Sequence, residues 1–206
     1  MTDVIKTWDY AILNTINNKG HFFLLDIILP VMRDANTWIP LYVALTLYTV
    51  YKFRRSSWIY ILCIVLAFGI SDFVNHELLK PFFARMRPCH HTDLSVRLVL
   101  GHCGGLWSFP SSHAANHMAM ALTIIGLPLF SGKLSKWLWL CWAGTIGYAQ
   151  IYVGVHFPTD IIAGFIFGSM VSLVIVQWIY PQLKKLHQKF DTKKLNSRKI
   201  KERKLN

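Results

Sequence analysis

The chain has 206 residues, a length that fits one domain. Hydrophobic residues make up 53% of it and the mean hydropathy is +0.36, which is high for a water-soluble protein. Much of the net charge of +12 lies after Pro181, beside the last apolar segment, which favours contact with anionic lipid over nucleic-acid binding. Apolar residues gather in blocks with Trp and Tyr near their ends, which predicts a helical protein that crosses a membrane several times.

Residues 1–37 are predicted to form an amphipathic region at the membrane interface. Apolar side chains recur there at helical spacing, as in an interfacial helix. They are Trp8, Ile12, Leu13 and Ile16. The next apolar run, residues 21–32, contains Asp26 and is shorter than the ~17 residues that a membrane span needs. We therefore expect a second interfacial or partly inserted helix in that run.

Residues 38–181 are predicted to form the core, an all-α bundle of five to six membrane spans. Apolar segments that can cross roughly 30 Å of hydrocarbon follow one another here, the first of them marginal in length. These segments are residues 38–53, 58–79, 113–130, 134–152 and 158–180. The remaining residues, 182–206, form a basic tail.

The charges between the segments predict how the bundle is oriented. If the segments alternate, three basic regions fall on one side, which the positive-inside rule makes cytoplasmic. These regions are the loop with Lys52, Arg54 and Arg55, the loop with Lys133 and Lys136, and the tail. The outer side then carries the loop of residues 80–112 and the turn of residues 152–158. That outer loop is itself basic, against the rule, and we interpret its cations as binding an anion.

Polar residues also interrupt the second strong segment near its outer end. Asp72, His76 and Lys80 follow one another at steps of four, which predicts that they share one helix face. Such a stripe is either a hydrogen-bonded feature of the bundle interior or a direct part of a functional site.

Three short motifs lie at segment ends on the outer side, where folding can bring them together. The motifs are Lys80-Pro-Phe-Phe-Ala-Arg-Met-Arg87-Pro88, Pro110-Ser111-Ser112-His113, and the pair His156 and Asp160. Each motif alone has a structural explanation, as headgroup-binding cations, helix caps or an ordinary helix pair. Their shared side and order favour one common site.

The residue types of these motifs suit phosphoryl chemistry, which requires a multiply charged phosphate to be held and stabilised. Lys80 and Arg87 can supply positive charge, and the helix start at Ser111 and Ser112 can supply N–H donors. A bond from Asp160 to one nitrogen of His156 would leave the other free to attack, and a second histidine, His113, can protonate the leaving oxygen.

This ordered pattern, Lys-x6-Arg-Pro, Pro-Ser-x-His and His-x3-Asp, resembles the type 2 phosphatidic acid phosphatase superfamily, to which vanadium haloperoxidases are related. The resemblance covers residues 38–180 approximately. It implies a metal-independent membrane lipid phosphatase that needs no cofactor and forms a phosphohistidine. It further implies that His156 is the nucleophile, Asp160 its orienting partner and His113 the general acid. The implied phosphate-binding residues are Lys80, Arg87, Ser111, Ser112 and Gln150.

The chain departs from the family pattern in two motifs. Ser112 stands where the family usually has Gly, and Ala149 and Gln150 stand where the third motif opens Ser-Arg. A glutamine amide can donate hydrogen bonds but carries no charge. We expect that Arg85, two residues before Arg87, restores part of that charge. The alternative is a catalytically impaired protein that only binds lipid phosphate.

The expected partners are the lipid bilayer and a membrane lipid phosphate. The resemblance allows undecaprenyl diphosphate, phosphatidic acid, phosphatidylglycerol phosphate or a lipid A phosphate, the last as substrate of a phosphatase or phosphotransferase. The short chain resembles bacterial members, which implies a multi-pass protein of the cytoplasmic membrane. Because an outward-facing site suits carrier recycling, undecaprenyl diphosphate is the favoured substrate.

The outer loop also contains two of the four cysteines, Cys89 and Cys103. In an oxidising compartment they are expected to form a disulfide that braces the loop. A different class of function, a metal sensor or transporter, would use them as ligands together with His90, His91 and His102. The spacing fits no standard zinc motif, and the cations nearby would repel a metal ion.

Overall fold

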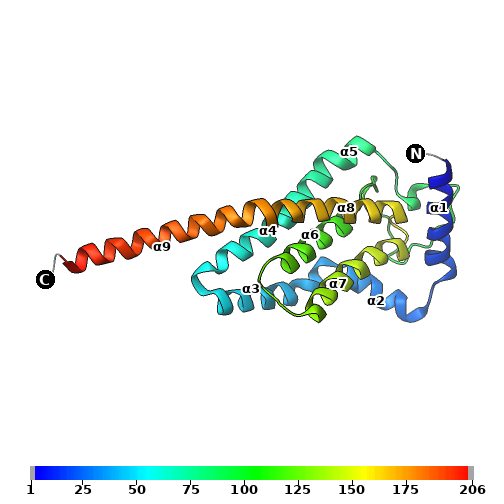
Figure 1. The fold of residues 1–206 in the computed structure, drawn as a ribbon. Coiled ribbons are helices and arrows are strands. Elements are labelled where there is room, and N and C mark those ends of the chain that lie inside the picture. The colour runs from blue at the N-terminus through cyan, green and yellow to red at the C-terminus, as the bar shows by residue number, and fades with distance from the viewer. Residues whose placement is uncertain (1–2, 204–206) are drawn as a thin grey trace.

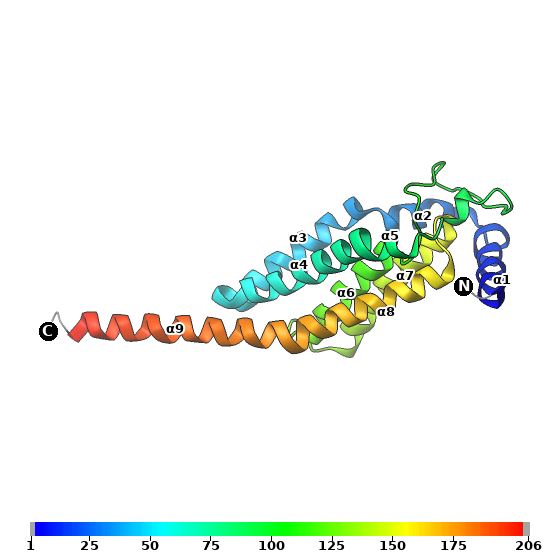
Figure 2. The ribbon, with the colours of Figure 1, turned by 90° about the horizontal axis from the view of Figure 1, so that it is seen from above.

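The computed structural model describes residues 3–203, with side chains described up to residue 192. Apart from one isolated β-bridge, all secondary structure in that range is helical. Figure 1 shows the elements from one side, and Figure 2 shows them from above. The α-helices are α1 (Asp3–Leu13), α2 (Phe23–Arg33), α3 (Ile39–Phe53), α4 (Ser57–Phe73), α5 (Lys80–Phe83), α6 (Ser112–Gly126), α7 (Lys133–Tyr152), α8 (Pro158–Val174) and α9 (Tyr180–Arg203). Three π-helical turns interrupt or extend them, namely η1 (Asn14–Lys19), η4 (Val74–Leu79) and η6 (Ile175–Ile179).

Helix α6 lies at the centre of the bundle and packs against α4, α7 and α8. Small side chains on α6 let its neighbours approach closely. The fully buried ones are Ala114, Ala115, Ala119 and Ala121. On the facing side of α8, a Cβ added to Gly168 would overlap the carbonyl oxygen of Ala115. The α6–α8 contact is therefore made backbone to backbone.

Many large apolar side chains point away from the bundle, as expected of a surface that faces lipid. Exposed examples on α3, α4 and α8 are Val43, Leu47, Val65, Phe68, Ile162 and Ile166. Two helical stretches, Ala35–Phe83 and Pro158–Thr192, are long and apolar enough to cross a membrane by length and composition. The first stretch contains α3 and α4, which run side by side in the view of Figure 2.

The three basic regions lie together at one end of the bundle. Lys52, at the end of α3, donates a 2.6 Å hydrogen bond to the carbonyl of Leu129, just before the loop that leads to α7. Arg55 forms a 3.5 Å ion pair with Asp191 of α9. Helix α9 continues α8 through η6 and projects beyond the bundle, as Figure 1 shows in orange and red. Residues 204–206 of the predicted tail fall outside the described residues.

The opposite end carries α1, α2 and the irregular segment of residues 84–111. Helix α1 lies across this end and buries Asp9 and Leu13 against it, whereas Trp8 remains 65% exposed. Leu13 packs with Phe157 and Ile161 from the start of α8. The segment is helical, but its apolar residues divide between the buried and the exposed side, and the buried face includes the carboxylate of Asp9.

Candidate active site

The turn between α7 and α8 positions His156 and Asp160. Asp160 lies in the first turn of α8, where its Oδ2 accepts a 2.8 Å hydrogen bond from the N–H of Phe157. The same oxygen lies 3.3 Å from Nδ1 of His156, whose side chain is buried. The carboxylate thus favours a proton on Nδ1 and leaves Nε2 with a free lone pair. Burial lowers the pKa of His156 to about 4, with Asp160 opposing the shift, so the imidazole is neutral near pH 7.

Arg85 joins this motif to the N-terminal helix. It donates 2.7 Å hydrogen bonds to Asp160 Oδ1 and to Thr159 Oγ1, and a 2.6 Å bond to Asp9 Oδ2. Its guanidinium also lies 4.1 Å above the ring of Phe157. Two buried carboxylates therefore neutralise Arg85. This corrects the expectation that Arg85 offers its charge to a phosphate; it fixes Asp160 instead.

Asp9 belongs to this network, although no motif in the sequence singles it out. The carboxylate of Asp9 also accepts a 2.9 Å hydrogen bond from the N–H of Thr159 at the start of α8. Asp9 lies four residues before Leu13, so both side chains point from one face of α1 into the molecule. The signal for Asp9 in the sequence was its spacing of four residues from Leu13, which places the carboxylate on the same helix face as an apolar side chain.

The second motif lies at the start of α6. Ser111 is the N-cap of the helix, and its backbone N–H donates a 3.0 Å hydrogen bond to the carbonyl of Asp160. The hydroxyl of Ser112 is buried and has no hydrogen-bond partner among the described residues. His113 follows in the first turn of α6. The second and third motifs are thus bonded to each other, at the helix terminus that presents free N–H groups.

The first motif contributes Lys80 at the start of α5 and Arg87 four residues past its end. Lys80 is buried, and Asp72 and Asp160 lie within electrostatic range of it. Arg87 donates a 3.1 Å hydrogen bond to the carbonyl of Cys103. Burial lowers the pKa of Arg87, an effect that the nearby charge of Asp160 opposes. A buried cation that retains free donors is suited to an anionic ligand.

Charges from separate motifs act on one another at this end of the bundle. The positive charges of Lys80 and Arg87 contribute to the lowered pKa of His156. His156 in turn lies within electrostatic range of His113. The structure therefore brings the three sequence motifs to one place. Gln150, near the end of α7, is fully buried, and neither its amide nitrogen nor its oxygen has a partner among the described residues.

The predicted stripe of Asp72, His76 and Lys80 is only partly present. Asp72 points inward and accepts a 2.8 Å hydrogen bond from Asn116 of α6, and Lys80 is buried. His76 is exposed and bonds to Glu77 instead. The reason is η4, because a π-helical turn holds more than 3.6 residues and shifts the register between Asp72 and Lys80. Asn75 takes the buried position, so His76 is not part of the site.

The outer loop is closed by a disulfide between Cys89 and Cys103, whose Cα atoms are 5.8 Å apart. The alternative of a metal site with Cys89 and Cys103 as ligands does not form, because their two sulfurs bond to each other. No group of three His, Cys, Asp or Glu side chains suited to a metal ion occurs within the described part of the chain. Arg97, another loop cation, donates a 2.7 Å hydrogen bond to Asp26 of α2. Its charge is therefore paired within the protein.

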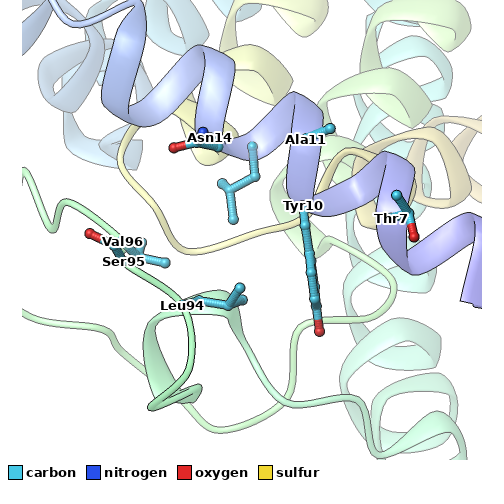
Figure 3. Close-up of a pocket in the computed structure, with 8 residues that line it drawn as sticks. Thr7, Tyr10, Ala11, Asn14, Leu94, Ser95 and Val96 are labelled. Atoms are coloured by element: carbon cyan, nitrogen blue, oxygen red, sulfur yellow. The ribbon is translucent and has the colours of Figure 1, made fainter.

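Two cavities open at this end. One, of 620 Å³, is lined by residues of α2 and the outer loop together with His113 of α6. The other, of 440 Å³, lies between α1 and residues 94–96, and Figure 3 shows its lining. That lining consists of Thr7, Tyr10, Ala11, Leu13, Asn14, Leu94, Ser95 and Val96. None of the motif residues reaches the second cavity, so the first is the candidate substrate cavity.

Known proteins resemble the chain in sequence and in fold. The family described as the PAP2 superfamily matches residues 56–184. The chain is 34% identical over 161 residues to the lipid A 4'-phosphatase of Porphyromonas gingivalis, covering 77% of this chain and 67% of that protein. It is 33% identical over 143 residues to the undecaprenyl-diphosphatase of Sulfolobus acidocaldarius, covering 68% and 62%. The crystal structure of Aquifex aeolicus LpxE superposes with a TM-score of 0.61 at 26% identity, covering 82% of this chain and 94% of that one.

Proposed function

The chain belongs to the PAP2 superfamily, and on that premise we propose that it removes a phosphate group from a membrane lipid, with His156 as the nucleophile. The observation that carries this proposal is the state of His156. The imidazole is buried and neutral, Asp160 holds its Nδ1, and Lys80 and Arg87 are placed to attract an anion beside it. A neutral, oriented imidazole next to two cations is the arrangement that attack on phosphorus requires.

The reaction proceeds in two steps. Nε2 of His156 attacks phosphorus, the bond from phosphorus to the lipid oxygen breaks, and His113 gives that oxygen a proton. Water then attacks the phosphohistidine while His113 takes up a proton, which releases inorganic phosphate and restores both histidines. Lys80 and Arg87 stabilise the charge on the phosphoryl oxygens, and Asp160 stabilises the cationic ring of His156. Arg85, Asp9 and Asp72 position these groups.

A further, apolar cavity supports a lipid as the substrate. An apolar cavity of 340 Å³ lies between α3, α4 and α6, and Ala35 lines both this cavity and the one at His113. Its other lining residues include Tyr42, Leu45, Phe68 and Met120. A phosphate at His113 could thus continue into an apolar tail beside α6, because ligand cavities pair polar anchors with apolar walls.

Two substrates are the leading candidates. The relative from Porphyromonas gingivalis acts on lipid A, which favours a lipid A phosphate monoester. The relative from Sulfolobus acidocaldarius is named for undecaprenyl diphosphate, the substrate that the sequence analysis favours. Both offer the same chemistry, a terminal phosphate on an amphiphile, so the site should be tested with both.

The two chemically different ends of the bundle support a proposed placement in the membrane. We assign α3, α4, α6, α7 and α8 as five crossings, within a core of residues 38–181 that follows an interfacial region of residues 1–37. The basic end and the tail of residues 182–206 face the cytoplasm, and the site faces outward. In a bacterial cytoplasmic membrane the reaction then occurs at the outer surface.

The test is phosphate release by protein purified in detergent, with a chelator present. The substrates are lipid A, undecaprenyl diphosphate, phosphatidic acid and phosphatidylglycerol phosphate, and the control is His156→Ala. We expect release that disappears in the variant and a radiolabelled phosphoprotein when the wild type is quenched in base. Silence of folded wild-type protein on all four lipids would contradict the proposal and favour a protein that only binds lipid phosphate.

A further inference from the structure

Arg33, a cation outside the three motifs, lines the candidate substrate cavity. Arg33 is the last residue of α2 and lines the 620 Å³ cavity together with His113. It forms no hydrogen bond or ion pair with any residue whose side chain the structure describes. Arg85 and Arg97, by contrast, are each bonded to buried or half-buried aspartates. Unlike Arg85 and Arg97, Arg33 therefore keeps its donors free for a ligand.

Helix α2 is held in a defined position, which fixes where Arg33 lies. Asp26, in the first turn of α2, accepts a 2.6 Å hydrogen bond from the hydroxyl of Tyr152 at the end of α7. One turn later, Leu29 is buried against Ala149 and Tyr152. Arg33 follows Leu29 by four residues, so it leaves the same face of α2 as this anchored side chain.

The electrostatic surroundings of Arg33 belong to the active site. Burial and the neighbouring charge of Arg87 lower the pKa of the Arg33 guanidinium to about 10, so that it remains charged at neutral pH. The positive charge of Arg33 also acts electrostatically on His113, more strongly than His156, His117 or Lys80 does. The carboxylate of Asp34, which also lines the cavity, opposes this lowering of the pKa of Arg33. Arg33 and Arg87 repel each other, and an anion bound between them would relieve that repulsion.

Gln150 lies beside the anchored helix α2. Its buried amide has no partner among the described residues, and it follows Ala149, which packs against Leu29 of α2. The end of α7 thus carries a polar side chain without charge, whereas Arg33 at the end of α2 carries a positive one.

We propose that Arg33 contacts the phosphate of the substrate, serving with Arg87 as a second guanidinium clamp at the cavity beside His113. This inference rests on the proposed function for its substrate, a lipid phosphate, but binding of phosphate itself does not depend on turnover. It assigns α2, a helix outside the three motifs, a direct part in substrate recognition.

The test compares Arg33→Gln and Arg33→Lys with wild type and with Lys133→Ala, an exposed cation at the basic end of α7. Arg33→Gln should lower kcat/KM for the lipid phosphate about 100-fold, as loss of one preorganised oxyanion donor does. It should also weaken competitive inhibition by inorganic phosphate at least about tenfold. Arg33→Lys should keep part of the wild-type kcat/KM and part of the wild-type inhibition by phosphate. Lys133→Ala should change neither quantity. Adding Gln150→Arg to Arg33→Gln should restore inhibition by phosphate.

Folding is checked by the melting temperature in detergent, and the same assay separates two kinds of failure. If the wild type is active and Arg33→Gln stays within twofold of it in kcat/KM and phosphate inhibition, the role of Arg33 is refuted alone. If the wild type releases no phosphate, the hydrolase proposal fails, and Arg33 is judged by ligand stabilisation. Inorganic phosphate should then raise the melting temperature of wild type but not of Arg33→Gln; equal shifts, or none, would refute the inference.

Discussion

At the scale of single residues, Asp160 is the group on which the site depends. Its Oδ2 holds Nδ1 of His156 and the start of α8, and its Oδ1 binds Arg85. The Asp160 carboxylate thus links the cation Arg85 to the imidazole of His156. In the proposed mechanism it stabilises the positive charge that develops on His156 during attack.

The protonation of His156 gives a prediction about pH. Attack requires the neutral imidazole, and burial lowers the pKa of His156 to about 4 from its ordinary value of 6.5. We expect the acid limb of kcat/KM in the free enzyme to fall near pH 4. Between pH 4 and 6.5 the unfolded state binds the additional proton, so the contribution of this group to stability falls as the pH drops through that window. A pH–rate profile together with melting curves checks both statements, and an acid limb at pH 6.5 or above would contradict them.

Arg85 gives a prediction about stability. Arg85→Met should leave the buried carboxylates of Asp9 and Asp160 unpaired, which costs on the order of 3 kcal/mol when one partner of a buried pair is removed. Phosphate release should fall as well, because Asp160 loses its support. The matched control is Arg55→Met, which breaks the exposed pair with Asp191 and should cost less than about 1 kcal/mol. Equal melting temperatures for the two variants would show that the network has no structural role.

At the scale of elements, the contact between α6 and α8 aligns the second motif with the third. Ser111 begins α6, and its N–H bonds to the carbonyl of Asp160 in α8. Gly164 and Gly168 allow this approach, because a Cβ at Gly164 would lie 2.7 Å from the carbonyl oxygen of Ser111. Helix spacing at this contact therefore controls the distance between the two histidines.

Gly168→Ala tests that control. The added methyl would overlap the backbone of Ala115, and a backbone cannot rotate aside as a side chain can, so α8 must move outward. We expect a lower melting temperature and at least about tenfold lower turnover, since misplaced catalytic groups lose rate steeply. Gly69→Ala is the control, because its Cβ would meet nothing within 4 Å. Wild-type turnover in Gly168→Ala would mean that the site tolerates a shift of α8.

At the scale of the whole molecule, the bundle has two chemically different ends. The site, the disulfide-closed loop and α1 lie at one end, and the basic loops and α9 lie at the other. Apolar side chains cover the helices between them. This arrangement matches a phosphatase that receives lipid phosphates at one membrane surface and is anchored by cations at the other.

The orientation can be measured with single cysteines. In a Cys141→Ser background, Thr92→Cys places a thiol in the outer loop and Lys133→Cys places one at the basic end, and both positions are exposed. If the basic end faces the cytoplasm, as proposed above, a membrane-impermeant thiol reagent should label Thr92→Cys in intact cells and Lys133→Cys only after permeabilisation. The reverse pattern would place the active site inside the cell.

The amino-acid sequence is sufficient to predict the all-helical class and the location of the site. A single apolar segment of membrane length can satisfy its own backbone polar groups only as a helix. The motifs lie at segment ends that the alternation of segments places on one side, and they point to His113, His156, Asp160, Lys80 and Arg87 as the candidate site residues.

The availability of each cation, by contrast, is settled by long-range packing. Arg85 and Asp9 are 76 residues apart in the chain, so their pairing depends on how α1 crosses the end of the bundle. Arg33 reaches the cavity because Tyr152 and Leu29 fix α2 against α7. The π-helical turn η4 turned His76 outward, a change of register that helical spacing alone does not reveal. Charge is a property of a residue, but its availability depends on partners that only the folded chain brings together.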